Sequence, residues 1–206
     1  MTDLGVRFPG IKHQATVIMA PSIWTIGHST RPLDEFLGLL VGSSIGLVAD
    51  VRRFPGSKRY PHFNAEALAG SLKHIGISYR HIPGLGGRRG KSAPDSPNGA
   101  WRNDSFNAFA DHMATSEFSA ALDELTSLAL DGNVVIMCSE AVPWRCHRRL
   151  IADALTVRNW SVFDVVGPRK IDLHALTDFA RVNGTTLTYP AEPLLGDGSD
   201  SGSALP

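Results

Sequence analysis

Runs of apolar, β-branched residues alternate along the chain with segments whose apolar positions recur at helical spacing. The short runs predict strands, and the helically spaced segments predict helices. The expected strands lie at 22–26, 45–51, 77–82, 134–138 and 160–166, with a further candidate at 185–189. The expected helices lie at 32–41, 65–75, 106–113, 117–130 and 144–157, with a short one near 173–182.

This alternation predicts the fold class. A strand, a helix and a second strand at this spacing pair in parallel through right-handed crossovers. We expect an α/β protein whose single domain has an open, mostly parallel sheet with helices on both faces, a Rossmann-like three-layer arrangement. The domain is expected to span residues 21–190, between an N-terminal extension at 1–20 and a flexible tail at 191–206 that has no basic residue and little to bury.

Polar clusters follow four of the predicted strands. One such cluster would carry little weight, since every strand must exit into a polar loop. Ligands of open α/β sheets bind outside the carboxyl ends of the strands, however, and all four clusters fall there. Together they contain His, Asp, Cys, Glu and several Arg, which favours one shared site. The clusters are Gly27-His28-Ser29, Asp50-Val51-Arg52-Arg53, Gly84-Leu85-Gly86-Gly87-Arg88-Arg89 and Cys138-Ser139-Glu140.

The composition indicates the class of protein and its expected location. The 206 residues are 43% hydrophobic and 19% charged, which is typical of a globular protein rather than a disordered or collagen-like chain. No apolar stretch is long enough for a membrane span, the first 20 residues do not resemble a signal peptide, and two cysteines are too few for a disulfide scaffold. We therefore expect a cytoplasmic protein with free thiols and no membrane partner.

The net charge is zero, but the charges are divided unevenly. Residues 1–105 carry 13 Lys and Arg against 7 Asp and Glu, and residues 106–206 carry 7 against 13. Within the first half, residues 52–91 hold nine basic residues against the single acid Glu66. A local positive field concentrates anions even on a neutral protein. The zero net charge excludes an indiscriminate polyanion binder, and the basic segment leaves room for a focused anion pocket.

Two parts of this basic segment suggest how an anion could be held. Residues 52–63 interleave cations with aromatic side chains, which suits a nucleotide because cations meet phosphates while rings stack on bases. A solvated loop pinned by its aromatic residues explains the same pattern equally well. The glycine-rich loop at 83–104 completes neither of the two phosphate-binding motifs that it partly resembles. Its glycines still allow a close approach of the backbone to a ligand, and Arg88 and Arg89 could grip a phosphate.

The segment after the fourth strand offers a thiol. A loop that leads into a helix N-terminus favours anions and would lower the pKa of Cys138, so a thiolate nucleophile is conceivable. Cysteine-dependent phosphatases need an arginine six positions after the cysteine, where this chain has Trp144, with Arg145 one position late. A small buried residue that ends a strand explains Cys138 equally well.

Cys138, Cys146 and His147 could instead ligate a metal. A closed structural zinc site usually brings paired cysteines two to four residues apart, which this chain lacks, and a fourth ligand would have to come from His28 or His62. The leading hypothesis therefore assigns no metal and requires no cofactor. It keeps Cys138, Cys146 and His147 as candidate thiol residues, and thiol or zinc-dependent chemistry stays an alternative.

Five motifs occur in order over about residues 22–166. They are Thr25-Ile26-Gly27-His28-Ser29, residues 50–57, Pro61-His62-Phe63, Leu85-Gly86-Gly87-Arg88, and Cys138-Ser139-Glu140 with Pro143 and Cys146-His147-Arg148. Together they resemble the bacterial and archaeal family catalogued as domain of unknown function 488. The resemblance implies an intracellular α/β domain whose shared polar residues form a common site. It implies no reaction, since the family is named for the lack of one.

The leading hypothesis is an enzyme that acts on a phosphate-bearing ligand, a nucleotide or nucleic acid, by hydrolysis of a glycosidic or phosphoester bond. Asp50 or Glu140 would act as base or charge stabiliser, with His28 as the acid/base partner. Other residues would bind the ligand: Ser29, Arg52, Arg53, Tyr60, His62, Gly86, Gly87, Arg88, Trp144 and Arg148.

Among these, the arginines would hold the anion, and Tyr60 and Trp144 would stack on a base. The alternative from another class is a non-catalytic nucleic-acid-binding module, whose whole function would be the basic segment.

Overall fold

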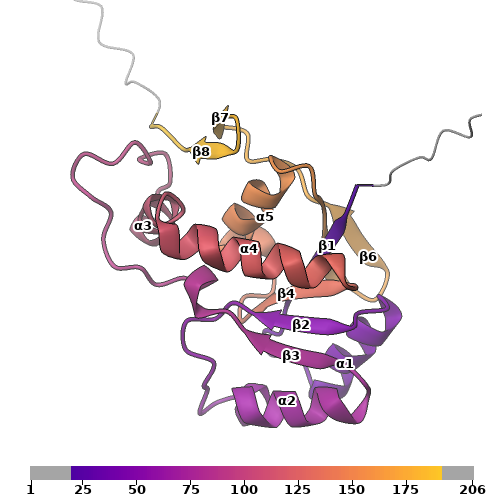
Figure 1. The fold of residues 1–206 in the computed structure, drawn as a ribbon. Coiled ribbons are helices and arrows are strands. Elements are labelled where there is room, and N and C mark those ends of the chain that lie inside the picture. Colours follow the sequence, from indigo (N-terminus) through magenta and orange to yellow (C-terminus); the bar gives the residue numbers. More distant parts are fainter. Residues whose placement is uncertain (1–19, 192–206) are drawn as a thin grey trace, which may run out of the picture.

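A six-stranded sheet forms the centre of residues 20–191, the part of the chain that the computed structural model describes (Figure 1). The strand order is β3-β2-β4-β1-β5-β6. Strands β1 to β5 pair in parallel, and β6 runs antiparallel to β5. The strands are β1 (Ser22–Gly27), β2 (Leu47–Asp50), β3 (Ser78–His81), β4 (Val134–Cys138), β5 (Ser161–Gly167) and β6 (Lys170–Leu173).

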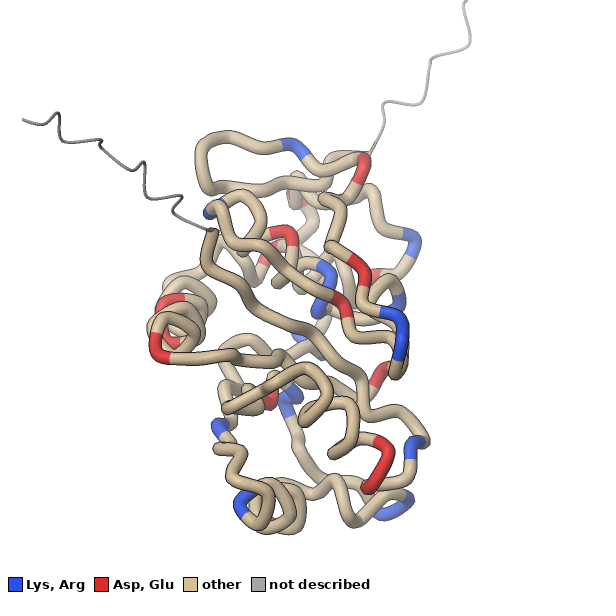
Figure 2. The backbone as a smooth tube through the Cα atoms, turned by 90° about the vertical axis from the view of Figure 1, so that its right-hand side faces the viewer, with Lys and Arg blue, Asp and Glu red and all other residues tan. Residues whose placement is uncertain are grey.

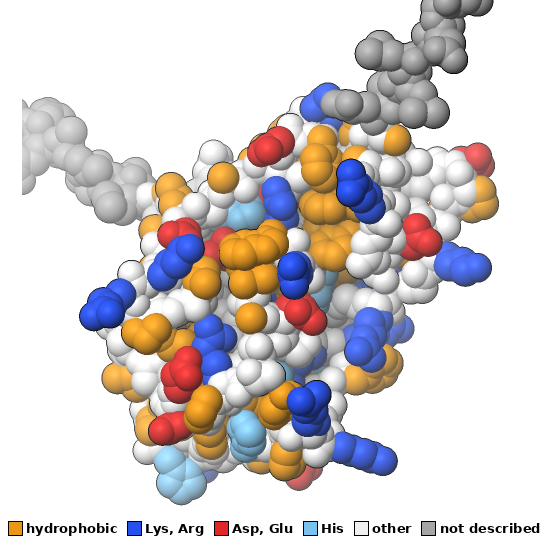
Figure 3. All heavy atoms as spheres, turned by 180° about the vertical axis from the view of Figure 1, so that it is seen from behind, with side chains coloured by type: hydrophobic (Ala, Val, Ile, Leu, Met, Phe, Trp, Pro, Cys, Tyr) orange, Lys and Arg blue, Asp and Glu red, His pale blue; other side chains and the backbone are white. Residues whose placement is uncertain are grey.

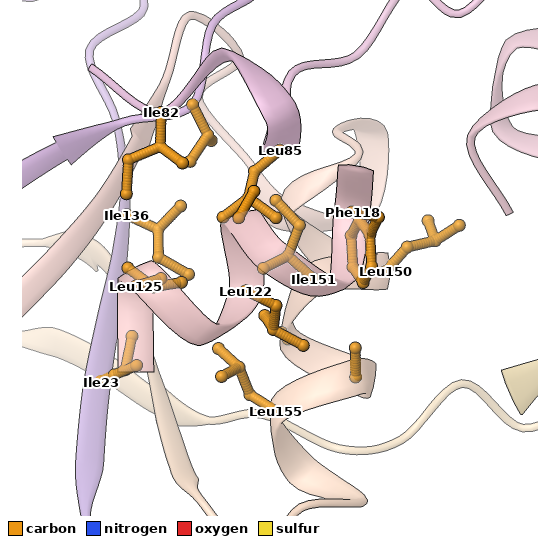
Figure 4. Packing of buried hydrophobic residues seen from close by; sticks show 14 of the residues in the cluster. Ile23, Ile82, Leu85, Phe118, Leu122, Leu125, Ile136, Leu150, Ile151 and Leu155 are labelled. Carbon is orange, nitrogen blue, oxygen red and sulfur yellow. The ribbon is translucent and has the colours of Figure 1, made fainter. Parts of the chain in front are cut away.

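Helices cover both faces of this sheet, as the sequence predicts. One face packs against α1 (Leu33–Gly42) and α2 (Ala65–His74). The other packs against α3 (Asp104–His112), α4 (Ser116–Leu130) and α5 (Arg148–Thr156). Figure 4 shows this second core, in which Leu122 and Leu125 from α4 lie near Leu155 from α5 and Ile136 from β4. The predicted α/β three-layer fold is confirmed.

Strand β4 shows why the sequence pattern predicts the sheet so well. All five of its residues are buried. Val134, Ile136 and Cys138 belong to the core on one face, and Val135 and Met137 belong to the core on the other. Side chains alternate across a strand, so a strand that is covered on both faces is buried along its whole length and is mostly apolar.

The C-terminal part departs from the prediction. The helix expected near 173–182 is wrong: β6 ends at Leu173, and a hairpin of β7 (Arg181–Asn183) and β8 (Thr186–Thr188) follows. Buried Asp153 of α5 accepts hydrogen bonds from the Thr177 amide and hydroxyl, at 3.1 and 2.6 Å, and contacts His174 Nε2 at 2.8 Å. These tertiary contacts fix the segment in a non-helical path, overriding its local helical spacing.

Two other segments differ in detail. The helix expected at 144–157 begins only at Arg148, and a 3-10 turn at Pro143–Arg145 precedes it. The long loop at 83–104 is anchored rather than loose, because the Asp111 carboxylate on α3 accepts hydrogen bonds from Ser92, from the Ala93 amide at 3.0 Å, and from Ser96 and Asn98. The extension expected at 1–20 and the tail expected at 191–206 lie, but for their innermost residues, outside the described range.

The topology creates a crevice where β4 and β1 lie side by side. The chain leaves β1 through α1 on one face toward β2, and it leaves β4 through α5 on the other face toward β5. Adjacent strands whose connections diverge in this way form a topological switch point, the usual ligand site of open α/β sheets. The loops after β1 and β4 are therefore the first place to look for a site.

Charged residues are distributed widely over the structure. Basic and acidic positions are interspersed along the backbone in Figure 2, and the face seen in Figure 3 mixes basic, acidic and hydrophobic side chains. On that face no continuous basic surface forms. Between residues 20 and 191, no helix combines the length and apolar character that a membrane crossing requires.

Candidate functional site

A pocket of about 690 Å³ opens at the carboxyl ends of the parallel strands. Loop residues after β1, β2, β3 and β4 line it, together with the start of α3. Each of the four polar clusters identified in the sequence contributes at least one residue to its wall. The segments that supply the wall are 28–30, 52–60, 87–88, 103–106 and 138–147.

The structure brings most of the predicted site residues into this pocket, though not all. Those that line it are His28, Ser29, Arg52, Arg53, Tyr60, Gly87, Arg88, Cys138, Glu140, Cys146 and His147. Those that lie outside its wall are Asp50, His62, Gly86, Trp144 and Arg148. The contacts of each group explain the division.

Asp50 is fully buried at the end of β2 and is saturated with donors. Arg52 Nε lies 2.9 Å from Asp50 Oδ1, and Arg52 Nη2 lies 2.5 Å from Oδ2. The Tyr79 hydroxyl donates to Oδ2 at 2.7 Å. A carboxylate held in this way has no free face for a substrate, so Asp50 fixes the position of Arg52.

His28 forms part of the pocket wall, and its side chain is buried. Burial, reinforced by the nearby charge of Arg52, lowers the pKa of His28 to about 4 despite the favourable contact with the Ser29 carbonyl. The ring is therefore neutral at pH 7. Its Nδ1 lies 3.0 Å from the Ser29 carbonyl, which can only accept, so Nδ1 carries the proton and Nε2 accepts from Arg52 Nη1 at 3.3 Å. Both nitrogens are thus engaged, and the ring also stacks on Phe63.

Four exposed arginines give the pocket its charge: Arg53, Arg59, Arg88 and Arg145. None of their guanidinium groups forms an ion pair or hydrogen bond with the part of the chain between residues 20 and 191. Glu140 is the single acidic residue in the wall, and its carboxylate is likewise without an ion pair in that range. The wall therefore has an excess of free positive charge around one exposed carboxylate.

Arg148 acts on the loop that carries Glu140. Its side chain is almost completely buried, and it donates from Nη2 to the Glu140 carbonyl at 2.6 Å and from Nη1 to Thr25 Oγ1 at 3.1 Å. Thr25 in turn donates to Asp164 at 2.6 Å. Gly27 also packs against this loop, so closely that a Cβ there would overlap the Glu140 carbonyl oxygen. These contacts hold the loop in place and leave Arg148 no contact with the pocket.

The glycines of the 83–104 loop allow close packing within the protein. A Cβ on Gly86 would lie 2.9 Å from backbone atoms of Arg53, and a Cβ on Gly87 would lie 2.9 Å from His147 Nδ1. Arg89 turns away from the pocket, donating to the carbonyls of residues 83, 84 and 86 and pairing with Glu117 at 3.0 Å.

Aromatic side chains supply the apolar part of the wall. Tyr60 lines the pocket as predicted, next to Phe54 and Phe106. His62 packs on the Phe63 ring with centroids 4.4 Å apart, and Trp144 is 52% exposed and points elsewhere. The pocket therefore offers three rings, of which the sequence-based site residues include only one.

Cys138, Cys146 and His147 meet at the inner wall. Their Sγ and Nδ1 atoms all lie within 4.8 Å of one another. The hydrogen bond with Cys146 and burial together raise the pKa of Cys138 to about 12, so the lowered pKa expected from the sequence is wrong. Burial also opposes ionisation of Cys146, but the hydrogen bond from Cys138 and the charge of Arg148 outweigh it and lower that pKa to about 6. The two thiols therefore titrate as a coupled pair, in which ionisation of one sulfur opposes ionisation of the other.

Several wall residues escaped sequence reasoning. Arg145 stands one position late for a phosphatase loop, yet it lines the same pocket. Arg59 lies in the basic aromatic segment, and that composition was its only signal. Asn103, Ser105 and Phe106 come from the start of α3, far from any strand end in the sequence, and only the fold places them in the wall.

Comparison with known proteins gives a family but no characterised relative. No curated protein and no solved structure matches the chain significantly. The family model described as Domain of unknown function DUF488 matches residues 32–155, which is more than half of the chain. The matched range contains three of the four polar clusters and all of the Cys138, Cys146 and His147 cluster. The chain therefore belongs to the DUF488 family.

Proposed function

We propose that this protein is an enzyme that binds a phosphate-bearing ligand, a nucleotide or nucleic acid, and hydrolyses a glycosidic or phosphoester bond in it. One observation carries the proposal: four arginines and the carboxylate of Glu140, none of them in an ion pair with residues 20–191, share a pocket at the switch point of the sheet. Cations around one available base form a site that binds an anion and activates water beside it.

The arginines supply the anion-binding part. Guanidinium groups match phosphate oxygens with paired, charge-assisted hydrogen bonds. Arg53 and Arg59 lie within 5.9 and 5.5 Å of the neighbouring rings of Phe54 and Tyr60, measured from the guanidinium carbon to the ring centroid. A cation beside a ring suits a nucleotide, because the phosphate and the base can be bound together.

Glu140 is the residue placed to act as general base. In the proposed step its carboxylate takes a proton from a water molecule, and the water oxygen bonds to phosphorus or to the anomeric carbon. The bond from that atom to the leaving group breaks, and the leaving group departs with the bonding electrons and takes up a proton from solvent. The Glu140 loop is held by Arg148 and packed against Gly27, which fixes the backbone from which the carboxylate extends. His28 and Asp50 then act as positioning residues for Arg52, since their polar atoms are already engaged.

The test uses the full-length protein and four compounds: a nucleoside monophosphate, the same nucleoside without phosphate, a dinucleoside phosphodiester and a single-stranded oligonucleotide. Chromatography would follow free base, inorganic phosphate and shortened products. We expect turnover of a phosphate-bearing compound and none of the plain nucleoside. Glu140→Gln should lower that turnover by at least about a hundredfold with binding retained, and Glu66→Gln, on the exposed side of α2, is the matched control.

The proposal fails if none of the four compounds is hydrolysed, or if Glu140→Gln leaves turnover unchanged. Oligonucleotide binding that falls steeply with salt, without turnover, would identify the non-catalytic nucleic-acid-binding module instead.

A further inference from the structure

We propose that Cys138, Cys146 and His147 form an open, catalytic-type Zn²⁺ site in the inner wall of the pocket. The inference goes beyond the proposed hydrolytic function, which does not require a metal. It rests on the geometry of the three ligand atoms, on the tautomer of His147 and on the place of the cluster in the pocket.

The three ligand atoms already lie near the corners of a zinc coordination sphere. Zinc–sulfur bonds of about 2.3 Å and zinc–nitrogen bonds of about 2.0 Å in a tetrahedron give sulfur–nitrogen separations of roughly 3.5 Å. His147 Nδ1 lies 3.7 Å from Cys146 Sγ and 4.0 Å from Cys138 Sγ. The two sulfur atoms lie within 4.8 Å of each other, against roughly 3.8 Å in a tetrahedral site, so movements of up to about an ångström would complete the arrangement.

His147 presents the correct nitrogen. Its Nε2 lies 3.2 Å from the Val51 carbonyl oxygen, which can only accept, so Nε2 carries the proton. Nδ1 is then unprotonated and directs its lone pair toward the two sulfur atoms. A hydrogen bond from the remote ring nitrogen to a backbone carbonyl is the usual support of a metal-bound histidine.

The supporting backbone is rigid. Cys138 ends the buried central strand β4, Cys146 follows the 3-10 turn, and His147 directly precedes α5. Gly87 leaves room beside the imidazole, since a Cβ there would lie 2.9 Å from Nδ1. The ligands are therefore held by regular elements, and a site held in this way loses little entropy when a metal binds.

The number of ligands indicates an open site. Structural zinc sites have four protein ligands, whereas catalytic sites have three and leave the fourth position to water or substrate. The sequence suggested His28 or His62 as a fourth ligand, but His28 contacts Arg52 and Ser29, and His62 lies outside the pocket. All three cluster residues line the pocket, so the fourth position faces it. Two thiolates and an imidazole favour zinc over the hard, oxygen-binding cations.

The test measures metal content in the full-length protein. The chain is purified under reducing conditions, loaded with Zn²⁺, freed of excess metal and analysed by plasma mass spectrometry. We expect about one zinc ion per chain, and a large loss in Cys146→Ser and in His147→Ala. His74→Ala, an exposed histidine on α2, is the matched control and should keep its zinc.

Cobalt provides a second readout that does not depend on the variants. Loading the wild-type chain with Co²⁺ should produce the thiolate-to-cobalt charge-transfer band and the strong visible absorption of a tetrahedral site, and Zn²⁺ should displace both. Less than about 0.2 zinc per chain after loading, well short of a single occupied site, would overturn the proposal. The proposal would also be overturned if Cys138 and Cys146 form a disulfide and the protein still takes up no metal after that disulfide is reduced. Because no substrate is involved, either result leaves the hydrolytic proposal to its own test.

Discussion

The Arg52 side chain forms an ion pair with Asp50, two residues earlier in the chain. Its Nε donates to Oδ1 at 2.9 Å, and its Nη2 donates to Oδ2 at 2.5 Å. Both side chains are buried, and the guanidinium also donates to the Phe63 carbonyl at 2.8 Å. The pair thus ties the end of β2 to the loop that carries Arg53, Arg59 and Tyr60 into the pocket. In the proposed enzyme this pair holds the loop that forms part of the pocket wall.

Asp50→Asn should therefore act on stability. It removes the negative charge and leaves the Arg52 guanidinium buried without a counterion, which we expect to cost about 3 kcal/mol in the free energy of unfolding. Urea unfolding would measure it. Glu140→Gln, at an exposed position, should change stability by less than about 0.5 kcal/mol. Equal losses in the two variants would contradict this division of roles.

Arg53 and Arg59 should control ligand affinity. Each is exposed in the pocket wall, so alanine at either position removes a charge-assisted contact with the phosphate. We expect each variant to weaken nucleoside monophosphate binding about tenfold and to reduce its salt dependence. Calorimetric titration would measure the affinity. Arg102→Ala, exposed but outside the pocket, is the control, and a loss of the same size there would point to a nonspecific charge effect.

Arg148→Met should loosen the loop that carries Glu140. The change leaves the Glu140 carbonyl and the Thr25 hydroxyl without their buried donor, at an expected cost of about 2–4 kcal/mol in unfolding free energy. Amide hydrogen exchange should speed up across residues 138–147 more than across α2. If exchange rises uniformly over the chain, the effect is global and Arg148 has no specific hold on this loop.

His174 should make the protein less stable in alkaline solution. Although burial opposes its charge, Asp153 and Asp164 raise its pKa from 6.5 to about 9. The folded chain then binds a proton more tightly than the unfolded chain. The stabilisation, of order 3 kcal/mol, is therefore complete below about pH 6.5 and is lost as the pH rises through about 9. Urea unfolding across this range should show the decline, and His174→Gln should flatten it. An unchanged decline in the variant would assign it to another group.

Gly87→Ala should disturb the imidazole of His147. The added methyl group would lie 2.9 Å from Nδ1, so the ring or the loop must shift, at an expected cost of about 1–2 kcal/mol. In the proposed zinc site the same shift should lower metal content. Gly56→Ala is the matched control, because Gly56 also lines the pocket but a Cβ there meets nothing within 4 Å. Normal zinc content in Gly87→Ala would show that the ring tolerates the methyl group.

The sequence by itself determined the layers of this protein. The fully apolar run at 134–138 and the alternation of strands with amphipathic helices predict a parallel sheet covered on both faces, because burial on two sides leaves no polar position in the central strand. The same logic placed four polar clusters at one edge, and each of them contributes to one pocket.

Only the tertiary structure decided which side chains remain free. Asp50 and Glu140 look alike in the sequence, but Asp50 is saturated by Arg52 and Tyr79, whereas Glu140 is exposed in the pocket wall beside exposed arginines. The helical spacing at 173–182 was overridden by hydrogen bonds to Asp153 from a distant helix. Such outcomes depend on partners far along the chain, and local pattern carries no information about them. Hydrogen-bond saturation and burial arise only when the layers pack together.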